Sequence, residues 1–497
     1  MPLNKAVVIG AGFSGLSAAC FMAKAGWHVT VIEKHPIPGG RARKMEEDGF
    51  TFDMGPSWYW MPDVFERFFS HFNKKVSDYY SLVRLDPSYR VYWTDGGVNI
   101  PADYPSLCAL FESIERGSAK QLDAFLKEAA FKYKTGMGKL VLKPGLSFTE
   151  FIEWDVITGA LKLDLFSSMK AHVSRYFKDK KLRELMEFPV LFLGALPEDT
   201  PALYSLMNYA DIIGGTWFPK GGMYSVVEGM YSLAKELGVI FQFNCEVEKL
   251  EIKHGIVEKI ITRNKHYEAD VIIGSADYHH IETKLLPPEC RNYSDAYWEG
   301  RKMAPGCLLY YVGINKKLSN ISHHTLFFDA PFQDHAEKIY KTKEWPEDPL
   351  FYVSTTTVTD ATLAPKGCEN LFFLIPVAPG LEDDSEALRE KYFSLIVDRF
   401  ERQTGEEIRN HIIFKKTYAH SNFIEDYHSF KGNAYGLANT LMQTAILKPS
   451  IKSKKVKNLY FTGQLTVPGP GVPPSLISGE IVSKQVLKDY KNSDLPY

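Results

Sequence analysis

Apolar and polar positions at the start of the chain follow the order strand, helix, strand. Ala6 to Ile9 form a short apolar run typical of a buried strand, and Val29 to Ile32 form a second one. Between the two runs, small and apolar side chains from Leu16 to Ala23 recur at helical spacing. This order predicts a βαβ unit, from which parallel sheets covered by helices are built.

The same patterns return in two later parts of the chain. Residues 224–237 carry apolar side chains on one helical face and are followed by Gly238, a residue typical of a helix end. Near the other end, an apolar run over 459–462 predicts a strand, and a helix is expected from Pro473 or Pro474. Further strands are predicted over 239–243 and 271–273, with a hairpin that pairs 247–252 with 256–262.

The stretches between these parts have a different character. The first contains a hairpin pattern over 89–100 and helical patterns over 107–142 and 161–196, where Pro189 is expected to break or kink the helix. The second contains strand-like runs and a helix over 385–404; the runs cover 307–314, 350–357 and 371–377.

These patterns together predict an α/β fold with two domains. A discontinuous Rossmann-like nucleotide-binding domain is expected to be interrupted by an α+β substrate domain. We assign residues 1–85, 218–291 and 445–497 to the first domain and residues 86–217 and 292–444 to the second.

Composition narrows the class of function. The 497 residues include 58 Lys and Arg against 60 Asp and Glu, so the net charge of −2 gives no basic field for nucleic acid. The six cysteines form no C-x-x-C pair, which fits a reducing cytosol and predicts no metal site. The pairs His279–His280 and His323–His324 lack carboxylate or cysteine partners at metal spacing, so we expect them in solvated loops.

Candidate chemistry begins with three glycines between the first strand and helix. Gly10 permits a tight turn, Gly12 lets the backbone approach a pyrophosphate, and Gly15 lets the helix pack closely on the strand. Glu33 follows at the separation where a carboxylate accepts hydrogen bonds from a ribose. An acid at this position argues against NADP and leaves NAD and FAD open. The 18 uncharged residues from Ala6 to Ala23 are not expected to be a targeting segment, because their glycines are spaced for a turn.

Two further features favour FAD over NAD. Gly39 and Gly40 precede Arg41, where glycine backbone could again pass close to a cofactor and the guanidinium could contact phosphate. At the far end of the chain, the loop from Gly463 to Gly471 leads into a helix whose N-terminus could stabilise a reduced flavin ring.

Two stretches of the sequence each allow two interpretations. Trp58, Tyr59 and Trp60 either belong to the core or line a substrate channel for a long apolar ligand. The basic cluster from Lys178 to Arg183, beside apolar helical faces, is either a membrane-surface element or a solvated face of the substrate domain.

Several motifs occur together in a fixed order: the glycine unit, PGGRA, GFTFDMGPSWYW, PKGGM and YFTGQLTVPGPGVPPSLISGE. With them the chain resembles, over residues 5 to 490, the bacterial phytoene desaturase family of FAD-dependent carotenoid oxidoreductases. The resemblance implies a bipartite fold like that of the flavin amine oxidases. It also implies a cytoplasmic protein that is peripherally attached to the inner membrane as a monotopic protein. It implies FAD contacts from Gly10, Gly12, Ser14, Gly15, Glu33, Lys34, Gly40, Arg41, Val247, Gly463, Gly471 and Val472. Ser14 stands where the family often has glycine. The bulky SWYW segment stands where many members have smaller residues, so the identity of the substrate is left open.

The resemblance also implies a reaction. A carotenoid, either phytoene or a later intermediate such as a hydroxylated γ-carotene, would lose a hydride to flavin and a proton to a base that the sequence does not identify. Quinone or dioxygen would reoxidise the flavin. The alternatives are another flavin amine oxidase-like oxidoreductase and a lipid escort that has lost its flavin; Glu33, Arg41 and the glycine loops argue against the escort.

Overall fold

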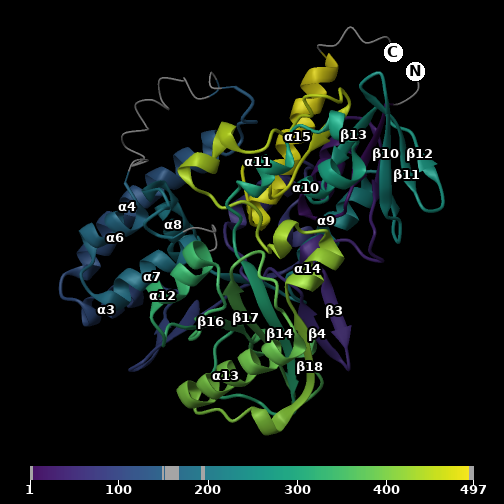
Figure 1. Ribbon diagram of the computed structural model, residues 1–497. Helices are drawn as coiled ribbons and strands as arrows, with labels where there is room; N and C mark the ends of the chain where they lie inside the picture. The colour runs from purple at the N-terminus through teal and green to yellow at the C-terminus, as the bar shows by residue number, and fades with distance from the viewer. Residues whose placement is uncertain (1–3, 148–149, 151–166, 192–195, 492–497) are drawn as a thin grey trace.

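Two sheets organise the chain in the computed structural model, which describes residues 4–147, 150, 167–191 and 196–491 (Figure 1). The first sheet has five parallel strands in the order β19-β13-β1-β2-β9. These strands are β1 (Lys5–Ile9), β2 (His28–Ile32), β9 (Ile240–Gln242), β13 (Val271–Gly274) and β19 (Leu459–Phe461). The predicted parallel sheet, drawn from distant parts of the sequence, is confirmed.

Both faces of this sheet are covered. Val8 faces three helices, α1 (Phe13–Lys24), α9 (Tyr224–Glu236) and α15 (Val472–Lys491), because alternate side chains of a strand point to opposite faces. Val7 and Ile9 face the antiparallel sheet formed by β10 (Val247–Lys253), β11 (Ile256–Thr262) and β12 (His266–Tyr267). Burial on both sides explains why β1 is a continuous apolar run.

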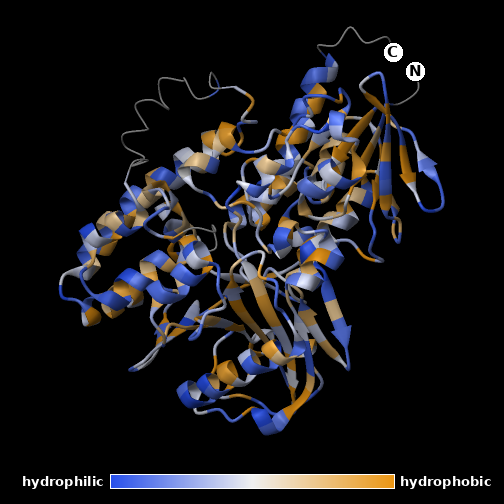
Figure 2. Cartoon of the chain, in the orientation of Figure 1, coloured by the Kyte–Doolittle hydropathy of each residue, from blue (hydrophilic) through white to orange (hydrophobic). Residues whose placement is uncertain are grey.

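The second sheet has seven strands in the order β18-β14-β17-β16-β15-β6-β7. They are β6 (Tyr89–Trp93), β7 (Gly96–Ile100), β14 (Gly306–Ile314), β15 (His324–Phe327), β16 (Phe351–Ser354), β17 (Glu369–Val377) and β18 (Ile412–Tyr418). Leu308 and Tyr310 face α13 (Glu386–Thr404), whereas Leu309 and Tyr311 face the opposite side. Figure 2 shows hydrophobic residues concentrated in the strands of both sheets.

A group of helices lies beside the second sheet, at the left of Figure 1. It contains α3 (Tyr104–Ile114), α4 (Ser118–Thr135), α6 (Met169–Tyr176), α7 (Lys180–Leu191) and α8 (Leu206–Ile212). Of the two outcomes expected at Pro189, a break is wrong within the described residues, because α7 continues to Leu191, whereas a kink stays a prediction. Phe188 and Val190 are buried on either side of Pro189, and this packing keeps the turn helical. Parts of the helix predicted over 161–196 lie outside the described residues, at 161–166 and 192–195.

Short elements join the two sheets. The chain leaves the first sheet through β5 (Leu82–Arg84) and returns through β8 (Trp217–Pro219), and these strands pair antiparallel. The predicted boundary at 85/86 lies one residue after β5, and the boundary at 217/218 lies within β8. The domain division itself stays a prediction. The remaining elements named below are β3 (Lys44–Glu47), β4 (Phe50–Asp53), α2 (Pro62–Ser70), α10 (Tyr278–His280) and α14 (His420–Tyr427).

Candidate active site

A cavity of about 390 Å³ lies where the first sheet meets the second. Residues that end or follow β1, β2, β13 and β19 line one part of it. In open α/β sheets, ligands bind outside the carboxyl ends of the strands, so the position of the cavity is that of a nucleotide site.

The structure brings together almost all residues predicted to bind the cofactor. Those that line the cavity are Gly10, Gly12, Ser14, Glu33, Lys34, Gly40, Arg41, Val247, Gly463, Gly471 and Val472. Gly15 does not line it. Its role is packing, because a Cβ atom there would lie 2.1 Å from the carbonyl oxygen of Gly10.

The turn after β1 leaves room for a ligand. Gly10 has φ +102°, a conformation that side chains other than glycine rarely adopt. A Cβ atom on Gly12 would meet no atom within 4 Å, so the backbone there is open to an approaching group. Gly12 also precedes α1 without a capping side chain, which leaves the first helical N–H groups available to a phosphate.

Glu33 ties the end of β2 to the glycine turn. Its carboxylate accepts a hydrogen bond from the backbone N–H of Ala11 at 2.7 Å and one from that of His35 at 2.9 Å. The side chain is buried and lines the cavity. Two backbone donors fix its orientation, and each oxygen keeps a further lone pair for a ribose hydroxyl.

Arg41 presents a buried cation to the cavity. Its guanidinium donates to Ser429 Oγ at 3.0 Å and lies 5.2 Å from the centre of the Tyr427 ring. The hydrogen-bond pattern assigns the Gln464 amide oxygen to the side that faces Arg41, where it accepts from both terminal nitrogens at 3.1 and 3.0 Å. Arg41 Nε has no hydrogen-bond partner among the described residues. Burial lowers the pKa of Arg41, while the Asp277 carboxylate opposes that shift. An unpaired nitrogen on a buried cation fits an anionic group such as a pyrophosphate.

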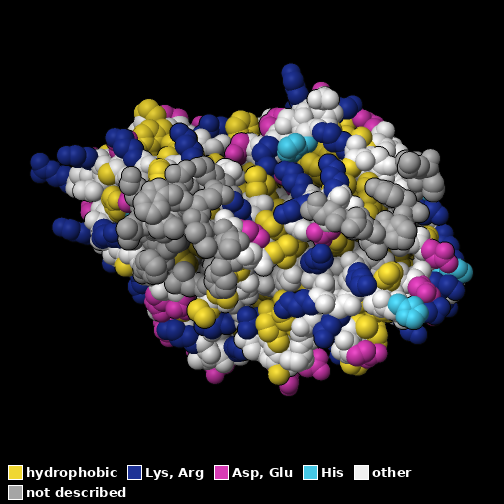
Figure 3. Space-filling view, turned by 90° about the horizontal axis from the view of Figure 1, so that it is seen from above, with side chains coloured by type: hydrophobic (Ala, Val, Ile, Leu, Met, Phe, Trp, Pro, Cys, Tyr) yellow, Lys and Arg dark blue, Asp and Glu magenta, His cyan; other side chains and the backbone are white. Residues whose placement is uncertain are grey.

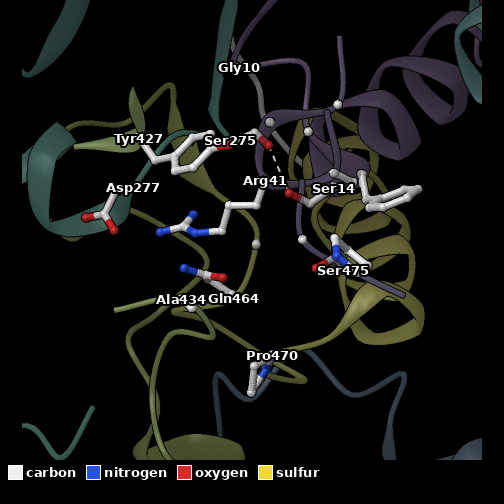
Figure 4. Close-up of a pocket in the computed structure, with 18 of the residues that line it drawn as sticks. Gly10, Ser14, Arg41, Ser275, Asp277, Tyr427, Ala434, Gln464, Pro470 and Ser475 are labelled. Carbon is white, nitrogen blue, oxygen red and sulfur yellow. Dashed lines mark hydrogen bonds between the residues drawn. The ribbon is translucent and has the colours of Figure 1, made fainter. Parts of the chain in front are cut away.

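Three site residues were not identified from the sequence. Ser275 Oγ lies 2.8 Å from Ser14 Oγ, and Figure 4 shows Asp277 and Gln464 on opposite sides of the Arg41 guanidinium. Burial raises the pKa of Asp277, and Arg41 opposes this shift. Each of the three follows the end of a parallel strand, β13 or β19, and that position was the signal that could have indicated them.

The cavity extends from these polar groups into an apolar arm. We use this name for the lining residues Trp58, Trp60, Met61, Met207, Leu309, Tyr352, Phe372, Leu374, Phe423 and Tyr435. The alternating side chains of β14 and β17 that turn away from α13 supply three of them.

The aromatic block divides between the cavity and the core. Trp58 and Trp60 line the cavity, but Tyr59 is absent from its lining. The Tyr59 ring stacks on Phe65 at 4.3 Å, and its hydroxyl lies 2.9 Å from that of Tyr80. Successive side chains of an extended segment point in opposite directions, so a channel role for all three residues is wrong for Tyr59.

Neither histidine pair lies in a solvated loop, so that expectation is wrong. His323 and His324 are 4% and 0% exposed, and burial lowers the pKa of His323 to about 3. His279 and His280 belong to α10 and are half-buried. His280 stacks on His428 at 3.9 Å, and burial lowers its pKa to about 3. Partners distant in sequence cover these imidazoles, which no local pattern could indicate.

Comparison with known proteins places the chain among flavoproteins. The family described as flavin containing amine oxidoreductase matches residues 13–487. A carotenoid 3,4-desaturase of Haloarcula japonica is 40% identical over 97% of this chain and 98% of its own. A ζ-carotene-forming phytoene desaturase of Myxococcus xanthus is 31% identical over 97% of this chain and 94% of its own.

Solved structures agree on the fold. An oxidoreductase from Methanosarcina mazei superimposes with a TM-score of 0.62 at 17% identity, over 97% of this chain and 100% of that one. Putrescine oxidase with bound putrescine gives a TM-score of 0.60 at 13% identity, over 98% and 99% of the two chains. The chain is therefore an FAD-dependent member of the flavin-containing amine oxidoreductases, and within them it belongs to the bacterial carotenoid desaturase family.

Proposed function

We propose that this chain is a carotenoid desaturase that introduces C=C bonds into a phytoene-type carotenoid, or into a later intermediate such as a hydroxylated γ-carotene. One observation carries the proposal: a single cavity joins the residues suited to a dinucleotide to the apolar arm. Long apolar ligands require such a lining, and its few polar groups could orient them.

FAD would extend along the cavity in this proposal. Glu33 would hold the adenosine ribose, and Val247 would lie near the adenine. The backbone from Gly10 to Ser14 and Arg41 would hold the pyrophosphate. Gly463, Gly471 and Val472, at the N-terminus of α15, would lie near the flavin. The flavin, when bound, supplies a hydride acceptor.

The protein's own contribution would be position and exclusion of water. Trp58, Phe372 and Leu374 would fix the depth and rotation of the polyene, so that a CH₂–CH₂ unit reaches the cofactor. Hydride transfer requires reacting atoms about 3–3.5 Å apart, which makes the depth of the chain decisive. An allylic cation is stabilised by its own conjugation, so a weak base is sufficient for loss of the proton.

A membrane surface would deliver the carotenoid. None of the helices in the described part of the chain is long and apolar enough to cross a bilayer. An apolar rim, formed by Leu146, Met442 and Leu447, is 41%, 73% and 40% exposed. Gly145, next to Leu146, packs closely on two other segments: a Cβ atom there would lie 3.2 Å from both Ala445 O and Val467 Cγ1. Leu146 therefore lies near the segment that carries Leu447 and near the loop before α15. The face seen in Figure 3 carries hydrophobic side chains interspersed with Lys and Arg, a combination that suits an anionic bilayer.

The experiment is expression in two hosts, one that accumulates phytoene and one that accumulates later carotenoids, followed by chromatography of the pigments. We expect a yellow, FAD-containing protein and more conjugated products in the phytoene host. Conversion in the second host alone would leave the later intermediate as the substrate. A protein that binds no FAD after reconstitution, or one that oxidises amines and leaves carotenoids unchanged, would overturn the proposal. Reoxidation of the reduced protein by quinone or by dioxygen, followed in the same preparation, identifies the electron acceptor.

A further inference from the structure

A buried carboxylate lies behind the aromatic wall of the apolar arm. It belongs to Asp211 on α8, which does not line the cavity, whereas Met207, one turn earlier on the same helix, does. Asp211 Oδ1 accepts a hydrogen bond of 3.0 Å from Thr216 Oγ1, which in turn accepts one of 2.9 Å from the indole nitrogen of Trp60. Trp60 lines the cavity, so two hydrogen bonds connect the cavity wall to the carboxylate.

The other carboxylate oxygen leads to the second tryptophan of the wall. Asp211 Oδ2 accepts a hydrogen bond of 2.9 Å from the hydroxyl of Tyr89, at the start of β6. The Tyr89 ring makes a T-shaped contact with Trp58, with ring centroids 5.4 Å apart, and Trp58 lines the cavity. Both tryptophans of the apolar arm are therefore connected to one carboxylate.

The charge of this carboxylate is not balanced by a cation within the described part of the chain. Burial raises the pKa of Asp211 to about 6, and only the two hydroxyl donors, among the described groups, oppose this shift. The carboxyl group is therefore mostly ionised at pH 7. A buried anion without a counter-ion is costly, so its surroundings favour a positive charge nearby.

We propose that Asp211 stabilises the positive charge that develops on the carotenoid in the apolar arm when a hydride leaves it. The inference rests on the proposed desaturase function. The hydride takes both electrons of its C–H bond to the cofactor, so the polyene carries one positive charge until the neighbouring carbon loses a proton to water or another weak base. The carboxylate itself takes no proton from the substrate, because it does not line the cavity.

Trp60 connects this charge to the substrate. The face of a tryptophan ring attracts cations, and donation of its N–H group toward a carboxylate raises the electron density of the ring. In an apolar site with a low dielectric constant, a charge two hydrogen bonds away also acts more strongly than in water. Asp211 is thus a positioning residue, which acts through Thr216 and Trp60 on a substrate that it does not touch.

A binding measurement without turnover tests the effect of the charge. The FAD-loaded protein in phosphatidylcholine vesicles at pH 8 is titrated with a long isoprenoid chain that carries a dimethylammonium group in its interior. A second titration uses the same chain with an uncharged C(CH₃)₂ group in that place. We expect the wild type to prefer the ammonium chain, and Asp211→Asn, which keeps the shape of the side chain, to show a preference about tenfold smaller. Partition into the lipid cancels, because both proteins meet the same vesicles.

Further variants separate the effect of charge from that of packing. Thr216→Val interrupts the connection to Trp60 and should lose part of the preference, whereas Thr216→Ser keeps the hydroxyl and should retain it. The matched control is Glu184→Gln, because Glu184 is a buried carboxylate that accepts from the indole of Trp93, which is absent from the described lining of the cavity. This variant should bind both chains as the wild type does. If Asp211→Asn fails to fold, an undiminished preference in Thr216→Val overturns the inference.

The rate of flavin reduction by carotenoid is the second readout. Asp211→Asn should lower this rate at saturating substrate by about tenfold or more and leave KM unchanged, because only the charged transition state loses an interaction. A raised KM with an unchanged rate, or the same ammonium preference as in the wild type, would overturn the inference. A wild-type protein that prefers the ammonium chain but desaturates no carotenoid would overturn the proposed function instead.

Discussion

Glu33 holds the glycine turn and presents its carboxylate to the cavity at the same time. Glu33→Arg should therefore abolish FAD retention, because it removes the ribose acceptors and places a cation at a buried position. Flavin absorbance after gel filtration measures this loss. Glu46→Arg, on the exposed part of β3, is the control and should stay yellow; a fully yellow Glu33→Arg protein would refute the assignment.

Trp58 and Tyr59 are neighbours with different surroundings, so they make a matched pair. Trp58→Ala should change the product distribution while FAD stays bound, because it widens the apolar arm. Tyr59→Phe should leave the products unchanged and lower the melting temperature slightly, because it removes only the bond to Tyr80. Chromatography of pigments from expressing cells compares the two. Identical products from Trp58→Ala and the wild type would indicate that Trp58 is a core residue and does not line a substrate channel.

Lys448 is a buried amine near the last loop of the site. Its Nζ has no hydrogen-bond partner among the residues described, and burial lowers its pKa from 10.5 to about 7. The unfolded chain therefore binds more protons between about pH 7 and 10.5, so this residue makes stability rise with pH across that range. Below pH 7 the amine is charged in both states, and the cost of burying the charge is greatest.

Lys448→Met removes this cost. At pH 6 we expect the variant to melt on the order of 2 °C or more above the wild type, and the difference should shrink as the pH rises to about 10. Thermal scans at one fixed rate on the FAD-bound proteins measure it. A lower melting temperature for the variant at pH 6 would mean that the amine stabilises the fold.

Close contact between α1 and α15 brings the two ends of the chain into one site. A Cβ atom on Gly479 would lie 2.5 Å from Ser14 O and 2.6 Å from Ser17 Cβ. Gly479→Ala should therefore separate the helices and destabilise the protein by about 1–3 kcal/mol, although alanine is the better helix former. Weaker FAD binding should accompany the lower melting temperature, because Ser14 lines the cavity. Lys488→Ala, exposed on the same helix, should change neither quantity.

Elements with their own periodicity could be predicted from the sequence. The helix α9 and the hairpin of β10 and β11 lie where the apolar pattern placed them. The pairing of strands could not be predicted, because register depends on side chains that meet only in the folded chain. The parallel pairing of β6 with β15, which places Arg90 opposite Thr325, is one such case.

The candidate site divides in the same way. The glycine turn and Glu33 belong to one short segment with a recognisable spacing, so the sequence was sufficient to identify them. Arg41 was identified, but its partners Ser429 and Gln464 were not, because they lie 388 and 423 residues further along the chain. The burial of His324 depends on Trp58 and Tyr352, which come from two other segments.

At the scale of the whole molecule, the proposed attachment to a bilayer depends on the apolar rim. Met442→Glu combined with Leu447→Glu should reduce co-sedimentation with vesicles of phosphatidylglycerol and phosphatidylcholine, because it removes apolar contact and adds negative charge. FAD content should not change. Ile413→Glu on β18, where the side chain is 54% exposed, is the control for a charge added elsewhere. Equal sedimentation of all three proteins would contradict a role for the rim.

The cofactor site also sets an order for biosynthesis. The turn at Gly10 to Gly15 leaves the ribosome early, but β19 and the first turn of α15 are translated only after both sheets have received their other strands. Until then β13 is an open edge, which other chains could pair with. If Gly463, Gly471 and Val472 hold the flavin as proposed, FAD binding has to wait until β19 and the first turn of α15 have been made, and a chain interrupted before β19 would lack that half of the site.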